Sequence, residues 1–296
     1  MPAQVRLGTR GSPLALKQAQ IVQERLQAHF PELQVAVVII KTQGDVDLQS
    51  PLSAIGGKGV FIKELEHALL AGEIDIAVHS LKDVTSRVHP ELGLAGFLKA
   101  ESIADALVSK SGYTLETLPL NAVVATGSIR RQALLKKLRP DVRTIGIRGN
   151  IQTRLAKLED DAIQAILLSE AGLIRMGCEY AVCRLDPEQF YPAPGQGVIV
   201  LQTRAIDVES EALCEAINSE DQSKLSRFEL QLLEYVGFDC RIPLGVYTQC
   251  QEGTLMMNVF LAQASLASWT EETLGCPESE AKDQIELLGR RLIAAI

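Results

Sequence analysis

Short apolar runs alternate with stretches of helical periodicity along the first 200 residues of the chain. An apolar run bounded by turn residues is typical of a buried strand, whereas apolar positions three and four apart indicate a helix face. The pattern predicts strands at residues 5–8, 35–40, 74–78, 123–125, 144–147, 162–168 and 198–202. It predicts helices at residues 13–28, 56–70, 129–138, 151–158 and 169–175. Such alternation is typical of an α/β fold with parallel sheets, which bind ligands at the carboxyl ends of their strands.

Three changes of pattern divide the chain. A break at residues 98–104 separates two sets of alternating strands and helices, and the turn-rich stretch 191–197 predicts a return to the first sheet. From residue 218 the pattern becomes a helix at 224–235, strands at 245–249 and 255–261, and a helix from 278. We therefore expect a discontinuous α/β domain at residues 1–98 with 198–217, an α/β domain at 103–193, and an α+β domain at 218–296.

Composition narrows the classes of function. The 296 residues are 47% hydrophobic, enough to fill sizeable cores, and the net charge of −8 with 4% aromatics argues against a nucleic-acid partner. No apolar stretch near the N-terminus is long enough to span a membrane, so we expect a cytoplasmic protein. Six dispersed cysteines predict reduced thiols, and the four well-separated histidines predict no metal site.

Six arginines stand at or near predicted strand-to-helix junctions, where unpaired backbone N–H groups favour anions. They are Arg10, Arg130, Arg131, Arg148, Arg154 and Arg175. Ser12 and Ser128 are N-cap residues of two of the helices, and Lys58 at a third helix start offers a further cation. Each arginine alone could equally form a surface ion pair worth about 0–1 kcal/mol. Together they predict a site for a ligand with several carboxylates.

Asp83 is the acidic exception among these cations. It follows Lys82 at the end of a predicted strand, and a carboxylate there can hold a cationic or N–H-bearing intermediate. An ordinary surface pair between Lys82 and Asp83 is the alternative. Nucleotide sites are excluded by context, since the glycines at 195 and 197 precede a strand and no complete phosphate loop surrounds Lys58.

The residues resemble the hydroxymethylbilane synthase family, also called porphobilinogen deaminases. The resemblance extends over nearly the whole chain, in the expected order, through seven segments: 9–16, 56–64, 79–84, 127–132, 148–154, 171–175 and 194–197. It implies an α/β fold in which two periplasmic-binding-protein-like domains flank a cleft, with a smaller α+β C-terminal domain. It also implies a monomer.

The resemblance further implies an enzyme that deaminates porphobilinogen. Four molecules would be joined head-to-tail onto a dipyrromethane cofactor held through a thioether on Cys240, and hydrolysis would release hydroxymethylbilane. Asp83 would be catalytic. The cofactor would be held by Cys240, Lys82, Asp83, Thr126, Ser128, Arg130, Arg131 and Arg148. The substrate would be held by Arg10, Ser12, Lys58, Arg148, Arg154 and Arg175.

Two segments depart from the family pattern. Phe238 and Asp239 replace the glycine pair that usually precedes the cofactor cysteine, and Ala100 and Ala104 stand where arginines are common. The main alternative function is a non-catalytic, periplasmic-binding-protein-like protein that binds carboxylates with the same cleft and arginines, without needing Cys240 or Asp83. A pyridoxal-phosphate enzyme using Lys82 is a further alternative, disfavoured by the missing phosphate loop.

Overall fold

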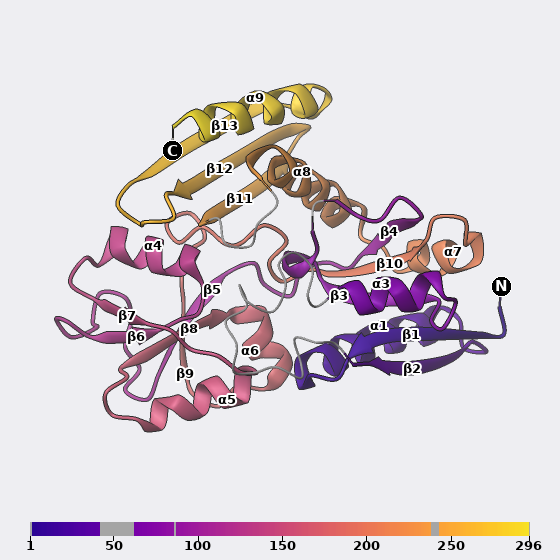
Figure 1. Cartoon of the computed structure of the whole chain (residues 1–296), viewed down its shortest axis with the longest axis horizontal. Coiled ribbons are helices and arrows are strands. Elements are labelled where there is room, and N and C mark those ends of the chain that lie inside the picture. Colours follow the sequence, from indigo (N-terminus) through magenta and orange to yellow (C-terminus); the bar gives the residue numbers. More distant parts are fainter. Residues whose placement is uncertain (1, 42–61, 86, 238–242, 296) are drawn as a thin grey trace. The chain divides into compact units, whose positions relative to one another are not determined.

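The computed structural model describes residues 2–41, 62–85, 87–237 and 243–295 (Figure 1). These residues form two compact units. The first unit contains residues 1–100 and 198–226, and the second contains residues 101–197 and 227–296. No helix among the described residues is long and apolar enough to cross a membrane.

The first unit is a five-stranded sheet covered by helices. Its strand order is β2-β1-β3-β10-β4, with β1 parallel to β2 and β3, and β10 antiparallel to both of its neighbours. The strands are β1 (Gln4–Arg10), β2 (Gln34–Ile40), β3 (Ile76–Ser80), β4 (Leu92–Phe97) and β10 (Ile199–Arg204). The helices are α1 (Pro13–His29), α3 (Lys63–Leu70) and α7 (Val208–Ala216), followed by the first residues of α8 (Glu220–Val236).

The predicted return of the chain to the first sheet is confirmed, because β10 inserts between β3 and β4. The expectation of a parallel sheet is wrong for this strand, since a strand arriving from outside the βαβ units can enter in either direction. The expectation of a buried strand at residues 35–40 is also wrong. Within the described residues, β2 is an edge strand that pairs with β1 alone, and Ile39 remains 55% exposed.

The sequence pattern did not predict β4, because two glycines interrupt its apolar run. Gly93 and Gly96 weaken the strand signal of the segment, and glycine in a strand often marks a close backbone approach. A Cβ at Gly96 would lie 2.9 Å from the carbonyl oxygen of Cys214, so α7 packs against this strand only because the side chain is absent.

The second unit contains another five-stranded mixed sheet, with the order β7-β6-β8-β5-β9. β6 is parallel to β7 and β8, whereas β5 is antiparallel to β8 and β9. The strands are β5 (Asp105–Ser109), β6 (Val123–Ala125), β7 (Arg143–Ile145), β8 (Ala165–Ser169) and β9 (Ala181–Arg184). The helices are α4 (Ile129–Leu138), α5 (Ile151–Leu155) and α6 (Glu170–Met176). The predicted helix at 129–138 and strand at 123–125 are confirmed to the residue.

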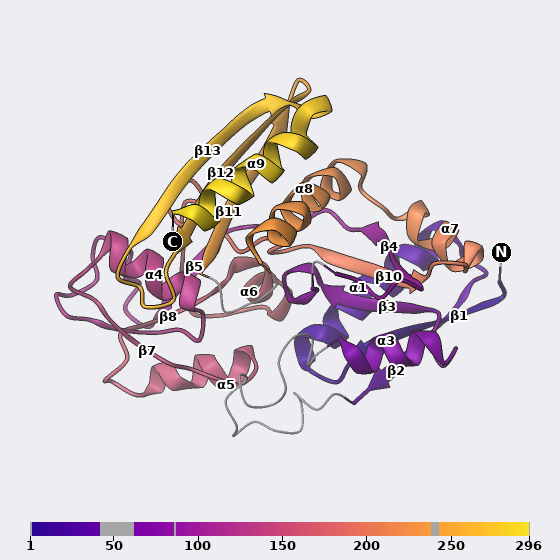
Figure 2. The ribbon, with the colours of Figure 1, turned by 45° about the horizontal axis from the view of Figure 1, so that its top comes forward.

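The same unit carries an antiparallel sheet near the C-terminus (Figure 2). Its strands are β11 (Leu244–Gln251), β12 (Thr254–Ala262) and β13 (Trp269–Pro277). The C-terminal half of α8 and all of α9 (Ala281–Ala294) share one hydrophobic core with these strands. Phe260 and Ala262 of β12 pack instead into the core formed with α4 and β6. The expected separation of a domain at residues 103–193 from a domain at residues 218–296 stays a prediction.

Candidate functional site

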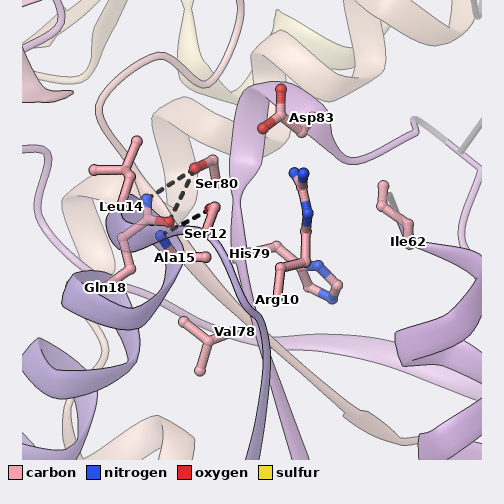
Figure 3. Close-up of a pocket in the computed structure, with 10 residues that line it drawn as sticks. All are labelled: Arg10, Ser12, Leu14, Ala15, Gln18, Ile62, Val78, His79, Ser80 and Asp83. Atoms are coloured by element: carbon pink, nitrogen blue, oxygen red, sulfur yellow. Dashed lines mark hydrogen bonds between the residues drawn. The ribbon is translucent and has the colours of Figure 1, made fainter. Parts of the chain in front are cut away.

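A pocket lies in the first unit where β1 and β3 end (Figure 3). These strands are parallel neighbours, so their carboxyl ends meet at one edge of the sheet. The pocket is lined by Arg10, Ser12, Leu14, Ala15, Gln18, Ile62, Val78, His79, Ser80 and Asp83. Three of the residues predicted from the sequence, Arg10, Ser12 and Asp83, therefore come together.

Helix α1 begins at this pocket and is fastened to it. The Ser12 hydroxyl accepts a hydrogen bond from the Ala15 amide at 3.3 Å, as the N-cap prediction required, and Pro13 occupies the first turn. One turn further, the Gln18 side chain is 3% exposed and donates from Nε2 to Ser80 Oγ at 2.8 Å. This bond links the first turns of α1 to the end of β3, so the two walls of the pocket hold a fixed spacing.

Asp83 ends a short 3-10 turn, Leu81–Asp83, that continues directly from β3. Leu81 is buried and its amide donates to the Val198 carbonyl at 3.0 Å, which anchors the start of the turn. The side chain of Asp83 is exposed and Lys82 is half-buried. Figure 3 shows the Arg10 guanidinium pointing toward the same end of the pocket as the Asp83 carboxylate. A carboxylate on an anchored turn is accessible to a ligand and yet positioned.

His79 forms part of the pocket floor without adding charge to it. It is 6% exposed and its Nε2 lies 3.0 Å from Gln202 Oε1, while Gln202 Nε2 donates to Glu66 Oε1 at 3.0 Å. Because the Gln202 amide group is already donating to Glu66, its oxygen faces His79 and Nε2 carries the ring proton. Burial, together with the nearby charge of Arg10, lowers the pKa of His79 to about 4. The ring is therefore neutral at physiological pH.

The second unit contains a buried charge cluster at the first turn of α4. Arg130 and Arg131 are 5% and 6% exposed, and both bind Asp105, which is fully buried. Arg130 Nη1 lies 2.6 Å from Asp105 Oδ2, and Arg131 donates to Oδ1 from Nε at 3.0 Å and from Nη2 at 2.8 Å. Gln196 Nε2 donates to the same Oδ1 at 2.9 Å. Asp105, Arg130, Arg131 and Gln196 are called the Asp105 cluster below.

The Asp105 cluster retains one net positive charge. Burial alone would raise the pKa of Asp105, but the charges and hydrogen bonds of the two arginines outweigh it and hold that pKa well below its usual range. Burial lowers the pKa of Arg130, and the proximity of Arg131 acts in the same direction against the attraction of Asp105. Two guanidinium groups facing one carboxylate favour a further anion, because unbalanced buried charge is costly.

The turns beside this cluster carry the other predicted residues. Thr126 is fully buried and its Oγ1 accepts from the Ser128 amide at 3.2 Å, while Ser128 caps α4. Arg148 follows β7, and Gly149 next to it has a φ of 104°, a conformation that glycine adopts without strain. Arg154 Nε donates to the Gly149 carbonyl at 2.7 Å.

Arg175 on α6 contacts the 194–197 segment. Its Nη2 donates to the Gly197 carbonyl at 2.6 Å. Lys58 and Cys240 lie outside the described residues, as do Phe238 and Asp239. Ala100 and Ala104, which depart from the family pattern, lie within the described residues. The Ala100 amide donates to Gln222 Oε1 at 3.1 Å, and Ala104 is fully buried.

Sequence reasoning missed Gln18, Asp105 and Gln196 as site residues. A local signal existed for two of them. Asp105 opens an apolar run that forms a buried strand, and a carboxylate in such a run requires a cation. Gln18 lies at helical spacing from Ala15 and Val22 on the buried side of α1. The signal for Gln196 was limited to its place in the 194–197 segment of the family resemblance, since its partners, the Ile103 carbonyl and Asp105, are distant in sequence. Among the described residues, no group of three or more His, Cys, Asp or Glu side chains could hold a metal ion.

Comparison with known proteins gives one consistent family. Residues 5–212 match the family model described as "Porphobilinogen deaminase, dipyromethane cofactor binding domain". A porphobilinogen deaminase of Chlorobium limicola is 40% identical over 262 residues, covering 88% of this chain and 84% of the relative. That of Chlorobaculum tepidum is 39% identical over 292 residues, covering 97% and 94%.

The solved structure of a methionine-binding protein, MetQ, also aligns with this chain. The alignment covers 78% of this chain and 96% of the chain of MetQ. Its identity is 15% and its TM-score 0.43, a likeness too distant to carry an inference.

Proposed function

The chain belongs to the porphobilinogen deaminase family, and from this premise we propose that its first-unit pocket is the reacting centre of a hydroxymethylbilane synthase. The reaction is a transfer in which porphobilinogen loses ammonia and four molecules are joined head-to-tail, and hydrolysis then releases linear hydroxymethylbilane. The observation that carries the proposal is the meeting of Asp83 and Arg10 at the carboxyl ends of β1 and β3.

Asp83 takes the catalytic role. A pyrrole offers one N–H donor, and its ring becomes electron-poor as the ammonia leaves. A fixed carboxylate can therefore accept a hydrogen bond from that N–H group and stabilise the positive charge. Asp83 stands on a turn anchored by Leu81, which limits how far the carboxylate can move. Lys82 next to it offers an ammonium for a ligand carboxylate.

Substrate binding falls to cations and to the Ser12 hydroxyl. Every porphobilinogen carries an acetate and a propionate, and charge-assisted hydrogen bonds to arginine orient such groups. We assign this role to Arg10, Ser12, Lys58, Arg148, Arg154 and Arg175.

The dipyrromethane cofactor fits the Asp105 cluster by charge. Two rings bring four carboxylates, and the cluster carries an excess positive charge at the start of α4, where backbone N–H groups point outward. We assign cofactor binding to Lys82, Asp83, Thr126, Ser128, Arg130, Arg131 and Arg148, with Cys240 forming the thioether. When bound, the cofactor supplies the pyrrole carbon to which the first substrate is joined.

Intact mass of the purified protein tests the covalent assignment. We expect the wild-type chain to be heavier than its sequence by one dipyrromethane. Cys240→Ser should lose both the added mass and porphobilinogen consumption, because no thiolate is left to form the thioether. The matched control is Cys178→Ser, a half-buried thiol on another segment, which should keep the adduct.

Two outcomes would favour the alternatives. A chain without the adduct that binds small carboxylates and leaves porphobilinogen unchanged would be a carboxylate-binding protein. Visible absorbance abolished by borohydride would indicate pyridoxal phosphate on Lys82.

We also propose that the protein acts in the cytoplasm as a monomer without a nucleic-acid partner. The net charge of −8 supports the last point.

A further inference from the structure

Helix α8 contacts the turn at residues 194–197 in the second unit. Gly195 in this turn has a φ of 70° and Gly197 a φ of 84°, so the backbone follows a course that other residues rarely adopt. Glu229, on α8, accepts a hydrogen bond from the Gly195 amide to its Oε2 at 2.7 Å. α8 ends at Val236, four residues before Cys240.

The same turn contacts the Asp105 cluster through its next residue. Gln196 is 2% exposed, and its Nε2 donates to Asp105 Oδ1 and to the Ile103 carbonyl, both at 2.9 Å. Asp105 in turn binds Arg130 and Arg131. An unbroken series of short contacts therefore runs from Glu229 through the backbone of Gly195 and the side chain of Gln196 to the two arginines.

We propose that Glu229 is a positioning residue that fixes the 194–197 turn, and through Gln196 the Asp105 cluster, relative to the helix leading to Cys240. The inference rests on the proposed function for its effect on turnover. Without the Glu229 contact, the Asp105 cluster and the helix that leads to Cys240 would be positioned by two separate segments of the chain. The contact between α8 and the 194–197 turn keeps the Asp105 cluster in register with the helix that ends at Val236.

Glu229 is also set up to respond to pH. Its partial burial raises its pKa to about 7, and the Gly195 amide and the Thr248 hydroxyl on β11, which favour the ionised form, offset only part of this effect. Among the described residues, these two are the groups that act on it from the elements packed against α8, and neither is charged. Above pH 7 an ionised Glu229 is the stronger acceptor for the Gly195 amide, and below pH 7 the neutral acid holds the turn less firmly.

Rising pH strengthens the hydrogen bond between Glu229 and the Gly195 amide but lowers the stability of the folded state. The neutral form is favoured in the folded state, so the stability that Glu229 contributes is present below the usual carboxyl pKa and is lost as pH rises toward 7. Glu229→Gln keeps an oxygen acceptor of the same shape and removes the titration. Glu229→Ala removes the acceptor. The two variants together separate the hydrogen bond from the charge.

The test combines hydrogen exchange, thermal unfolding and kinetics on the full-length protein. In Glu229→Ala we expect protection of the Gly195 amide to fall about tenfold or more, with a lower kcat at a nearly unchanged KM. Glu229→Gln should keep that protection within about threefold and should flatten both the pH profile of kcat and the fall in Tm between pH 5.5 and 8.5. Glu220→Gln, an exposed change in the first turn of the same helix, should match wild type throughout.

Unchanged Gly195 protection in Glu229→Ala would overturn the proposal, and so would a wild-type pH profile in Glu229→Gln. Exchange and unfolding can both be measured in the Cys240→Ser background, where no cofactor contributes. A failure of the proposed function would instead leave these two readouts intact, while the wild-type chain showed no mass adduct.

Discussion

Asp83→Asn is expected to lower kcat by about 10²- to 10³-fold while KM stays within about threefold, because an amide keeps the shape but not the charge of the carboxylate. The charge matters only once ammonia leaves and the pyrrole becomes electron-poor. The proposed contacts of Arg10 and the other cations with the substrate carboxylates should remain in the variant. Asp83 is exposed on its turn, so folding should be unaffected.

Steady-state porphobilinogen consumption and thermal unfolding measure this prediction, with Asp221→Asn as the control. Asp221 is exposed on α8 in the same unit, so the control removes one negative charge away from the pocket. A raised KM with unchanged kcat would assign Asp83 to ground-state binding. A kcat loss that Asp221→Asn reproduces would assign the effect to net charge.

The arrangement of strand ends was predictable from the sequence because it follows from local chemistry. A serine before a proline predicted the start of α1, and the apolar run before Lys82 predicted β3, so Arg10 and Asp83 could be placed at neighbouring strand ends. The same reasoning placed Arg130 and Arg131 in the first turn of α4. Motif and element agreed because each depends on residues a few positions apart.

The partners of these residues were not predictable in the same way. Asp105 binds arginines 25 and 26 positions away, and Gln196 reaches it across 91 positions. Sequence periodicity contains no information on such pairings. It also failed on β13, where exposed positions alternate with half-buried or buried ones and the first half of the strand is largely polar. A strand paired on only one side needs little apolar surface.

The Asp105 cluster therefore changes the interpretation of Arg130 and Arg131. Neither is an exposed cation waiting for a ligand, since each already binds a buried carboxylate. Asp105 fixes the guanidinium groups before any ligand arrives and lowers the cost of burying two like charges. The excess charge is then one rather than two, and this remaining charge is available to attract the carboxylates of the proposed cofactor.

Asp105→Asn is expected to lower the free energy of unfolding by about 3–5 kcal/mol, because it leaves two buried guanidinium groups without a counter-charge. Urea unfolding in the Cys240→Ser background, where no cofactor contributes, measures the effect. The matched control is Asp161→Asn, an exposed aspartate of the same unit, which should change stability by less than about 0.5 kcal/mol.

The effect should depend on pH with a defined sign. The pKa of Asp105 is depressed in the folded state, so its contribution is present above the usual carboxyl pKa of about 4 and is lost as pH falls below that value. The gap between the parent and Asp105→Asn should therefore be full at pH 7 and should narrow under acid conditions. Equal stability of the two proteins at pH 7 would mean that the arginines find other partners, and that Asp105 does not hold them in place.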